Sequence, residues 1–144
     1  MNRVYIAAPF FNDRQLETIE QIKLMLNLHA VKYFSPKDES NFKQGDCPKE
    51  ILDINCSGII HSSLVIAVTD DKDVGTMWEA GFAYAYNVPI IYLWLDYKPG
   101  MKFNIMLAAS GIGVCHTFMQ LQYQIARFKR GESLIDFSIG MKHE

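Results

Sequence analysis

The sequence has few of the residues and motifs that mark metal, redox and nucleotide triphosphate chemistry. Among its 144 residues are three cysteines and four histidines, and neither type recurs at a metal-ligand spacing such as HExxH. It has no GxGxxG motif, no P-loop and no GxSxG motif, which argues against dinucleotides, nucleoside triphosphates and acyl transfer. We therefore predict no metal site and no cofactor. An odd number of cysteines without a pattern indicates free thiols, so we expect a cytoplasmic protein.

Strong charge of one sign and long hydrophobic runs are also missing. The formal net charge is −2, so no basic field favours nucleic acid or an anionic membrane. The longest apolar runs have about the length of a strand and fall far short of a membrane span. The first residues lack the long apolar stretch of a secretory signal. With 49% hydrophobic and 21% charged residues, the composition predicts one globular domain over residues 1–144.

Short apolar runs alternate with segments of helical spacing along the chain. Because the predicted strands are apolar throughout, we expect an α/β fold: a five-stranded, doubly wound parallel sheet with helices on both faces, in the flavodoxin-like order 2-1-3-4-5. The long polar segment 37–47 is typical of a functional lid, and the tail 132–144 receives no assignment. The predicted strands are 3–9, 31–36, 64–70, 88–95 and 112–116, and the predicted helices are 13–30, 48–63, 75–87, 101–110 and 117–130.

Ligands of such sheets bind beyond the carboxyl ends of the strands, between the first and third strands in this order. The loops expected there are residues 7–15, AAPFFNDRQ, and residues 69–79, TDDKDVGTMWE. The aspartates of the second loop are by themselves typical of a solvated acidic loop with a helix cap. Glu79 differs, because it follows Trp78 and precedes the apolar AGFAYA. An ionised, partly desolvated carboxylate is suited to attack an anomeric carbon.

A second acidic residue, Asp53, lies within the apolar pattern of the second predicted helix, between Leu52 and Ile54. By itself this position fits an exposed residue on a helix surface as well as a functional one.

Three segments together resemble the nucleoside 2-deoxyribosyltransferase family. They are VYIAAPFFNDRQ, EILDINCSGIIHSSLVIAVTDDKDVGTMWEAGFAYAYNVPIIYL and KFNIMLAAS, and they span about residues 3 to 110. The resemblance implies the flavodoxin-like fold. It also implies an enzyme that cleaves the N-glycosidic bond of a 2′-deoxynucleoside and passes the deoxyribosyl group to another purine or pyrimidine base.

The resemblance implies a catalytic role for each of four residues. Glu79 would be the nucleophile that forms a glycosyl ester, and Tyr5 would orient it by a hydrogen bond. Asp73 would contact the nucleobase and help to protonate it. Asp53 would lie beside Glu79 and the sugar, or act in proton transfer.

The resemblance also implies how the substrate is bound. Asn104 would contact the 5′-hydroxyl group in the site of a neighbouring subunit, and Phe10 would stack near the base. The partners would be a small-molecule 2′-deoxynucleoside and a free nucleobase. The assembly would be a homo-oligomer built on dimers, with a hexamer as the larger option. Further substrate-binding residues would be Ala8, Gly75 and Trp78.

Two alternatives stay open at this point. One is a deoxynucleoside 5′-monophosphate N-glycosidase, a hydrolase on the same scaffold, which requires phosphate-binding groups. It is less favoured because the turn AAPFFND contains no serine and Thr76 stands where such relatives carry one. The other is a non-catalytic nucleotide-binding module, since a fold alone does not determine function.

Overall fold

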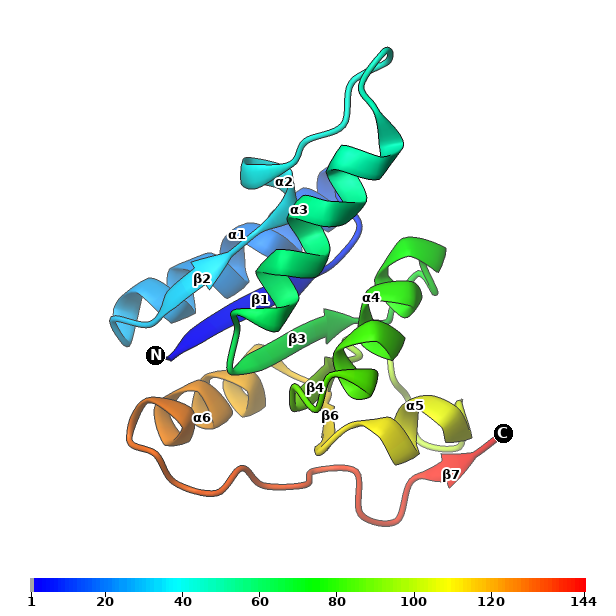
Figure 1. Cartoon of the computed structure of the whole chain (residues 1–144). Coiled ribbons are helices and arrows are strands. Elements are labelled where there is room, and N and C mark those ends of the chain that lie inside the picture. Colours follow the sequence, from blue (N-terminus) through cyan, green and yellow to red (C-terminus); the bar gives the residue numbers. More distant parts are fainter. Residues whose placement is uncertain (1) are drawn as a thin grey trace.

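The computed structural model, which describes residues 2–144, contains one central sheet with helices on both of its faces (Figure 1). The strands are β1 (Arg3–Ala7), β2 (Lys32–Phe34), β3 (Leu64–Val68), β4 (Ile90–Leu93), β5 (Lys102–Phe103), β6 (Gly113–Cys115) and β7 (Lys142–His143). The helices are α1 (Asp13–Leu28), α2 (Pro36–Glu39), α3 (Pro48–Ile60), α4 (Val74–Ala85), α5 (Ile105–Ser110) and α6 (Phe118–Lys129).

The central sheet is parallel and has the order β2-β1-β3-β4-β6. Since β6 is the fifth predicted strand, the predicted flavodoxin-like order is confirmed. The sheet is parallel because its strands that follow one another in the chain are joined by crossovers that contain a helix. The carboxyl ends of β1 and β3 consequently lie side by side at one edge, in the register Ala7 to Ala67.

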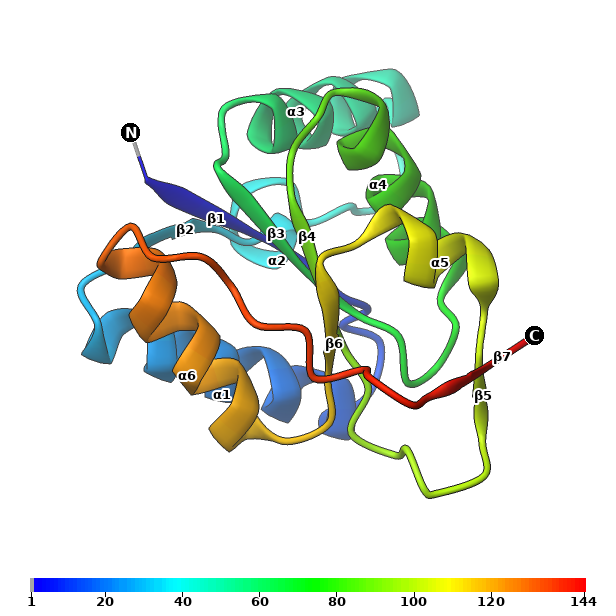
Figure 2. The same ribbon diagram turned by 90° about the horizontal axis from the view of Figure 1, so that it is seen from below.

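Alternate side chains of the strands build two cores, one on each face of the sheet. On one face, Ile6 and Ile66 pack with apolar residues of α1 and α6, such as Ile22 and Leu121. On the other face, the core contains Ile59 of α3 and Ala80 and Ala83 of α4, together with Tyr5, Ala7 and Val65. Figure 2, seen from below, shows α1 and α6 on one side of the sheet and α3 and α4 on the other. Tyr5 therefore faces α4, the helix that carries Glu79.

Three parts of the chain differ from the prediction. The short helix α2 covers residues 36–39, where the end of a strand and the start of a loop were predicted. The predicted helix 101–110 is split: its first residues form β5, and α5 begins after Asn104, whose side chain accepts hydrogen bonds from the amides of Met106 and Leu107. The unassigned tail returns along the molecule and pairs as β7 with β5 in a two-stranded parallel sheet. Both strands have only two residues, which is too short for a recognisable sequence pattern.

Between α6 and β7, the tail is held in place by side chains of α6. Gln124 of α6 is buried; it accepts a hydrogen bond of 2.9 Å from the amide of Ile135 and donates one to the carbonyl of the same residue. Arg127 donates to the carbonyl of Ser133 at 2.5 Å. These contacts satisfy backbone groups in a segment without secondary structure, and they lead the tail across the molecule to β5.

Candidate functional site

A cavity of about 440 Å³ lies at the carboxyl edge of the sheet, beside the ends of β1 and β3. Its walls come from the segment after β1, from α2 and the loop that follows it, and from the first two turns of α3 and α4. Its size falls within the range of small-molecule sites. The lining residues are Ala8, Pro9, Phe10, Phe11, Pro36, Ser40, Phe42, Pro48, Ile51, Leu52, Asn55, Asp73, Gly75, Trp78 and Glu79.

Glu79 lies in the second turn of α4 and is the residue that the sequence marked as unusual. Its carboxyl group accepts a hydrogen bond from the hydroxyl group of Tyr5. Tyr5 is fully buried in β1, and its ring stacks on Phe34 with 5.2 Å between the ring centroids. A phenol fixed by packing leaves its hydroxyl group little freedom, so it holds the carboxyl group of Glu79 in one orientation.

The surroundings of Glu79 favour its protonated form. Burial raises the pKa of Glu79 from 4.5 to about 7, and the negative charge of Asp73 acts in the same direction. The hydrogen bond from Tyr5 opposes this by stabilising the carboxylate. The pKa of Tyr5 is raised, first by burial and then by the negative charge of Glu79, so the phenol remains a donor. A carboxyl group with a pKa near neutrality, in a cavity, is a mark of a functional site.

Asp73 is the N-cap residue of α4 and also lines the cavity. Its Oδ2 accepts two hydrogen bonds from Thr76, one from the backbone amide at 2.9 Å and one from the hydroxyl group at 2.8 Å. Aspartate is favoured at this position because it satisfies a free amide and complements the helix dipole. The cap fixes a carboxylate at the cavity wall, and Gly75 adds no side chain between it and the cavity.

Aromatic side chains form much of the remaining wall. Phe10 and Phe11, after β1, stack with 5.5 Å between ring centroids, and Trp78 stacks on Phe82 at the same distance. Trp78 is 50% exposed, whereas Ala8, which also lines the cavity, is buried. Flat apolar surfaces of this kind bind planar ligands by stacking. The predicted residues Tyr5, Ala8, Phe10, Asp73, Gly75, Trp78 and Glu79 are therefore brought together around one cavity.

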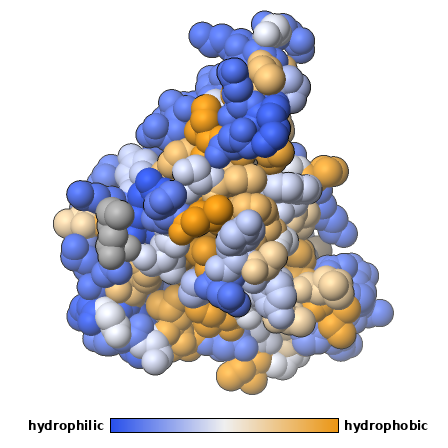
Figure 3. Space-filling view, viewed as in Figure 1, coloured by the Kyte–Doolittle hydropathy of each residue, from blue (hydrophilic) through white to orange (hydrophobic). Residues whose placement is uncertain are grey.

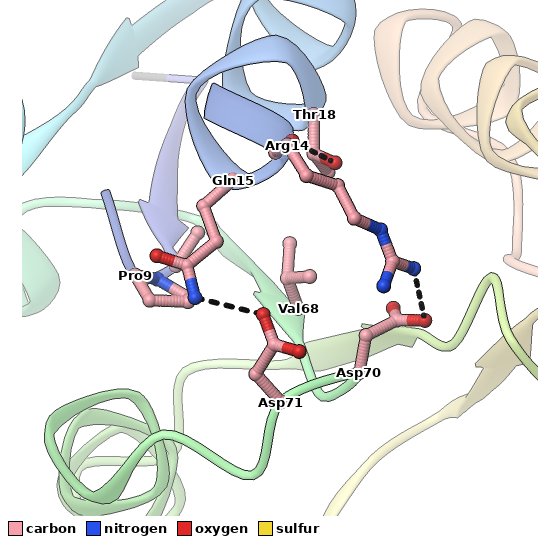
Figure 4. A pocket seen from close by; sticks show the side chains of 8 residues that line it. Pro9, Arg14, Gln15, Thr18, Val68, Asp70 and Asp71 are labelled. Carbon is pink, nitrogen blue, oxygen red and sulfur yellow. Dashed lines mark hydrogen bonds and ion pairs between the residues drawn. The ribbon is translucent and has the colours of Figure 1, made fainter. Parts of the chain in front are cut away.

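The other two aspartates of the loop after β3 have a bracing role. Figure 4 shows Arg14 and Gln15 of α1 directed at Asp70 and Asp71 across a narrow hollow of about 10 Å³. Arg14 lies 3.5 Å from Asp70, and Gln15 donates to Asp71 at 2.7 Å. The Gln15 side chain also accepts from the amide of Phe11 at 2.7 Å. These contacts connect the two loops that hold the cavity walls.

Asp53 lies outside this cluster, contrary to its predicted position beside Glu79. It is exposed on α3, forms an ion pair with Lys49, and lines a separate surface hollow with Arg3 and His61. The reason is helical geometry: two positions along a helix turn a side chain through about 200°. Residues four apart share a face, so the cavity face of α3 carries Ile51 and Asn55.

Asn55 is a cavity residue that the sequence reasoning missed. Its Oδ1 lies 2.5 Å from the hydroxyl group of Ser40, which follows α2. The available signal was the spacing of Ile51, Asn55 and the fully buried Ile59, each four residues apart. This spacing places Asn55, and not Asp53, on the inward face of the helix.

Asn104 lies at a different cavity, of about 690 Å³, on the other side of the segment after β3. Trp94, Phe103 and Glu144 also line this second cavity. Glu144 is adjacent because its amide donates to the carbonyl of Phe103, and its own carbonyl accepts from Ile105. Within one chain, Asn104 therefore does not contribute to the cavity that contains Glu79.

Among residues 2–144, no group of three or more histidine, cysteine, aspartate or glutamate side chains is arranged to hold a metal ion. None of the helices described in this range has the length and apolar character needed to cross a membrane.

Fold and cavity define a doubly wound α/β protein with a partly buried carboxyl group in a largely apolar cavity at the carboxyl edge of its sheet. Residues 4–130 match the family model described as Nucleoside 2-deoxyribosyltransferase, and the chain belongs to this family. The predicted family is thereby confirmed. A search of curated protein sequences finds no match to the chain.

Solved structures share the fold at low sequence identity. A 2-deoxyribosyltransferase from Bacillus psychrosaccharolyticus is 19% identical with a TM-score of 0.71, and the match covers 98% of this chain and 97% of that one. A conserved protein from Enterococcus faecalis is 18% identical with a TM-score of 0.76, covering 88% and 98%. A CMP N-glycosidase from Clostridium botulinum is 19% identical with a TM-score of 0.61, covering 86% and 98%.

Proposed function

We propose that the protein is a nucleoside 2-deoxyribosyltransferase that moves the deoxyribosyl group of a 2′-deoxynucleoside to another nucleobase. The observation that carries the proposal is the pair formed by Glu79 and Tyr5 at the wall of an aromatic cavity. Membership of the family supports the same reaction class. The substrates are a small-molecule deoxynucleoside and a free purine or pyrimidine base, and the protein acts without a cofactor.

In the first half-reaction, Glu79 in its ionised form attacks C1′ from the face opposite the base. The N-glycosidic bond breaks, and Asp73 relays a proton from solvent to the departing base. The transition state resembles an oxocarbenium ion, which a nearby carboxylate stabilises before it closes to an ester. Tyr5 holds the carboxyl group so that one oxygen faces the sugar.

In the second half-reaction, a ring nitrogen of the incoming base attacks C1′ and the ester bond to Glu79 breaks. The proton lost by the incoming base goes through Asp73 to solvent, which restores the starting state. Each half-reaction inverts the configuration at C1′, so the β configuration is retained overall. The stacked rings of Phe10 and Phe11 at 5.5 Å are suited to hold both bases in turn.

The charge of the cavity wall favours a neutral nucleoside over a nucleotide. Among residues 2–144, those that line the cavity include no lysine, arginine or histidine, and their two ionisable groups are the carboxyl groups of Asp73 and Glu79. A 5′-phosphate group carries two negative charges and is bound in proteins by cationic side chains and free helix amides. Here the Thr76 amide is occupied by Asp73. This argues against the 5′-monophosphate hydrolase.

We also propose a homo-oligomer built on dimers, with a hexamer as the larger option, in which Asn104 contacts the 5′-hydroxyl group in the site of a neighbouring subunit. Asn104 is exposed and lines a cavity different from that of Glu79, so its contribution requires a second copy. Dilution to monomers should then abolish activity, as measured by turnover alongside sedimentation. Full activity in the monomer would refute this part.

A chromatographic assay with deoxyinosine and free adenine tests the function. A transferase produces deoxyadenosine and hypoxanthine, whereas a hydrolase produces base and free sugar without exchange, and a binding module produces neither. Glu79→Ala should abolish exchange while circular dichroism shows a folded protein. Full exchange activity in Glu79→Ala would disprove the proposed mechanism.

A further inference from the structure

The segment between α2 and α3 rises above the rest of the molecule (Figure 1). Residues 41–50 are all exposed, and Phe42 is the one aromatic residue among them. Figure 3 shows this projection as mostly hydrophilic, with apolar surface gathering lower on the same face. Phe42 is nevertheless 46% exposed and lines the cavity that contains Glu79. A single aromatic side chain thus extends from a polar loop to the mouth of the site.

The loop is anchored where it begins, and its middle makes no contact of that kind. Ser40 is buried, and its hydroxyl group lies 2.5 Å from the Oδ1 of Asn55 on α3. Asp38 forms a 2.8 Å ion pair with Lys23, which attaches α2 to α1. Among residues 2–144, by contrast, the hydrogen bonds of residues 41–46 are internal to the loop and join Lys43 and Asp46.

The far end of the loop is also fixed, because the carbonyl of Cys47 accepts from the amides of Glu50 and Ile51 in the first turn of α3. Gly45 has a φ of +95°, a conformation that glycine adopts without strain. A short segment with two fixed ends, internal hydrogen bonds and no packed core is the kind of element that opens and closes over a site.

We propose that Phe42 is the movable cover of this site and determines whether the glycosyl ester on Glu79 reacts with a base or with water. The inference rests on the proposed function. In transfer, a ring nitrogen of the base bonds to C1′, the bond from C1′ to Glu79 breaks, and the proton goes to Asp73. In hydrolysis, a water oxygen bonds to C1′ instead, the same bond breaks, and the proton lost by the water goes to Asp73. The products are then free 2-deoxyribose and the Glu79 carboxylate.

The physical reason is that the two reactions differ in what occupies the space beside the ester. An aromatic base fills that space by stacking, whereas water enters only if the space is open to solvent. Phe11 and Trp78, the exposed parts of the other walls, are carried by the anchored loop after β1 and by α4. Phe42 is carried by the loop that lacks such anchoring, so its side chain can move aside when a base enters or leaves the cavity and can cover the cavity at other times.

The experiment measures the ratio of free deoxyribose to newly formed nucleoside, with one deoxynucleoside donor and one acceptor base at fixed concentrations. We expect Phe42→Ala to raise this ratio roughly tenfold or more. Phe42→Leu should restore most of the wild-type ratio, because it restores an apolar cover. Gln44→Ala, an exposed change in the same loop but outside the cavity lining, is the matched control and should leave the ratio unchanged.

A second variant tests the anchor without touching Phe42. Ser40→Ala removes the hydrogen bond to Asn55 and should raise the same ratio, by less than Phe42→Ala does. The proposal is overturned if Phe42→Ala keeps the wild-type ratio, or if Gln44→Ala changes it equally. A wild-type protein that releases no base from any donor instead overturns the proposed function, and the role of Phe42 with it.

Discussion

Replacing Glu79 by glutamine should make the folded protein more stable at pH 8 while removing its activity. Burial raises the pKa of Glu79 from 4.5 to about 7 in the folded protein. At ~1.4 kcal/mol for each pH unit, this disfavours the ionised folded protein by roughly 3 kcal/mol. Below the unfolded pKa both states bind the proton and no penalty exists. As the pH rises from 4.5 to about 7, only the unfolded chain loses its proton, so the free energy of unfolding decreases; above the folded pKa the loss is complete.

Urea unfolding followed by far-ultraviolet circular dichroism at pH 4, 6 and 8 measures this effect. Glu79→Gln should gain roughly 3 kcal/mol over wild type at pH 8 and almost nothing at pH 4. The glutamine oxygen can still accept from Tyr5, so packing is preserved. The matched control is Glu17→Gln, an exposed residue of α1, which should change stability by no more than about 0.5 kcal/mol at any of these pH values. Equal stability of Glu79→Gln and wild type at pH 8 would refute the account of a destabilised carboxylate.

Three further substitutions probe the same site. Tyr5→Phe removes the hydrogen bond that lowers the pKa of Glu79, so the acidic limb of the kcat/KM profile should move above pH 7. At neutral pH, kcat/KM should fall roughly tenfold or more. An acidic limb at an unchanged pH would contradict this. Asp73→Asn keeps a good helix cap but removes a charge that raises the pKa of Glu79, so the acidic limb of the kcat/KM profile should move to lower pH. The same variant should release the base more slowly, which a purely structural role of Asp73 as a helix cap would not cause. Asp53→Asn breaks an exposed ion pair with Lys49 and should cost no more than about 0.5 kcal/mol and little turnover, so a large loss of turnover would return Asp53 to the site.

The fold was largely predictable because its signals are long and repeated. Five apolar runs separated by helical segments specify a parallel sheet covered on both faces, and the observed strand order is the predicted one. The parts that were not predictable depend on tertiary contacts. Strands β5 and β7 have two residues each, and Gln124 directs the tail by a contact with Ile135 that no local pattern encodes.

A site residue could be predicted where a charged side chain interrupts an apolar segment. It could not be predicted where only the direction of a side chain on a helix decides whether it reaches the cavity. Glu79 stood out because a charge beside Trp78 and an apolar helix requires an explanation, and the structure places it against Tyr5 in a cavity. Asp53 and Asn55 are only two positions apart, and choosing between them required the phase of the helix. Neither the acidic type of Asp53 nor its position within an apolar pattern contained that information.

The most direct test of the central claim is a rapid-quench experiment with a deoxynucleoside and no acceptor base, followed by mass spectrometry of peptides. We expect a burst of free base equal in molar amount to the enzyme, and one deoxyribosyl group attached to the peptide that contains Glu79. An added acceptor base should remove this group as new nucleoside, and Glu79→Gln should form no adduct. Turnover without an adduct, or an adduct on Asp73 instead, would contradict the assignment of Glu79 as the nucleophile.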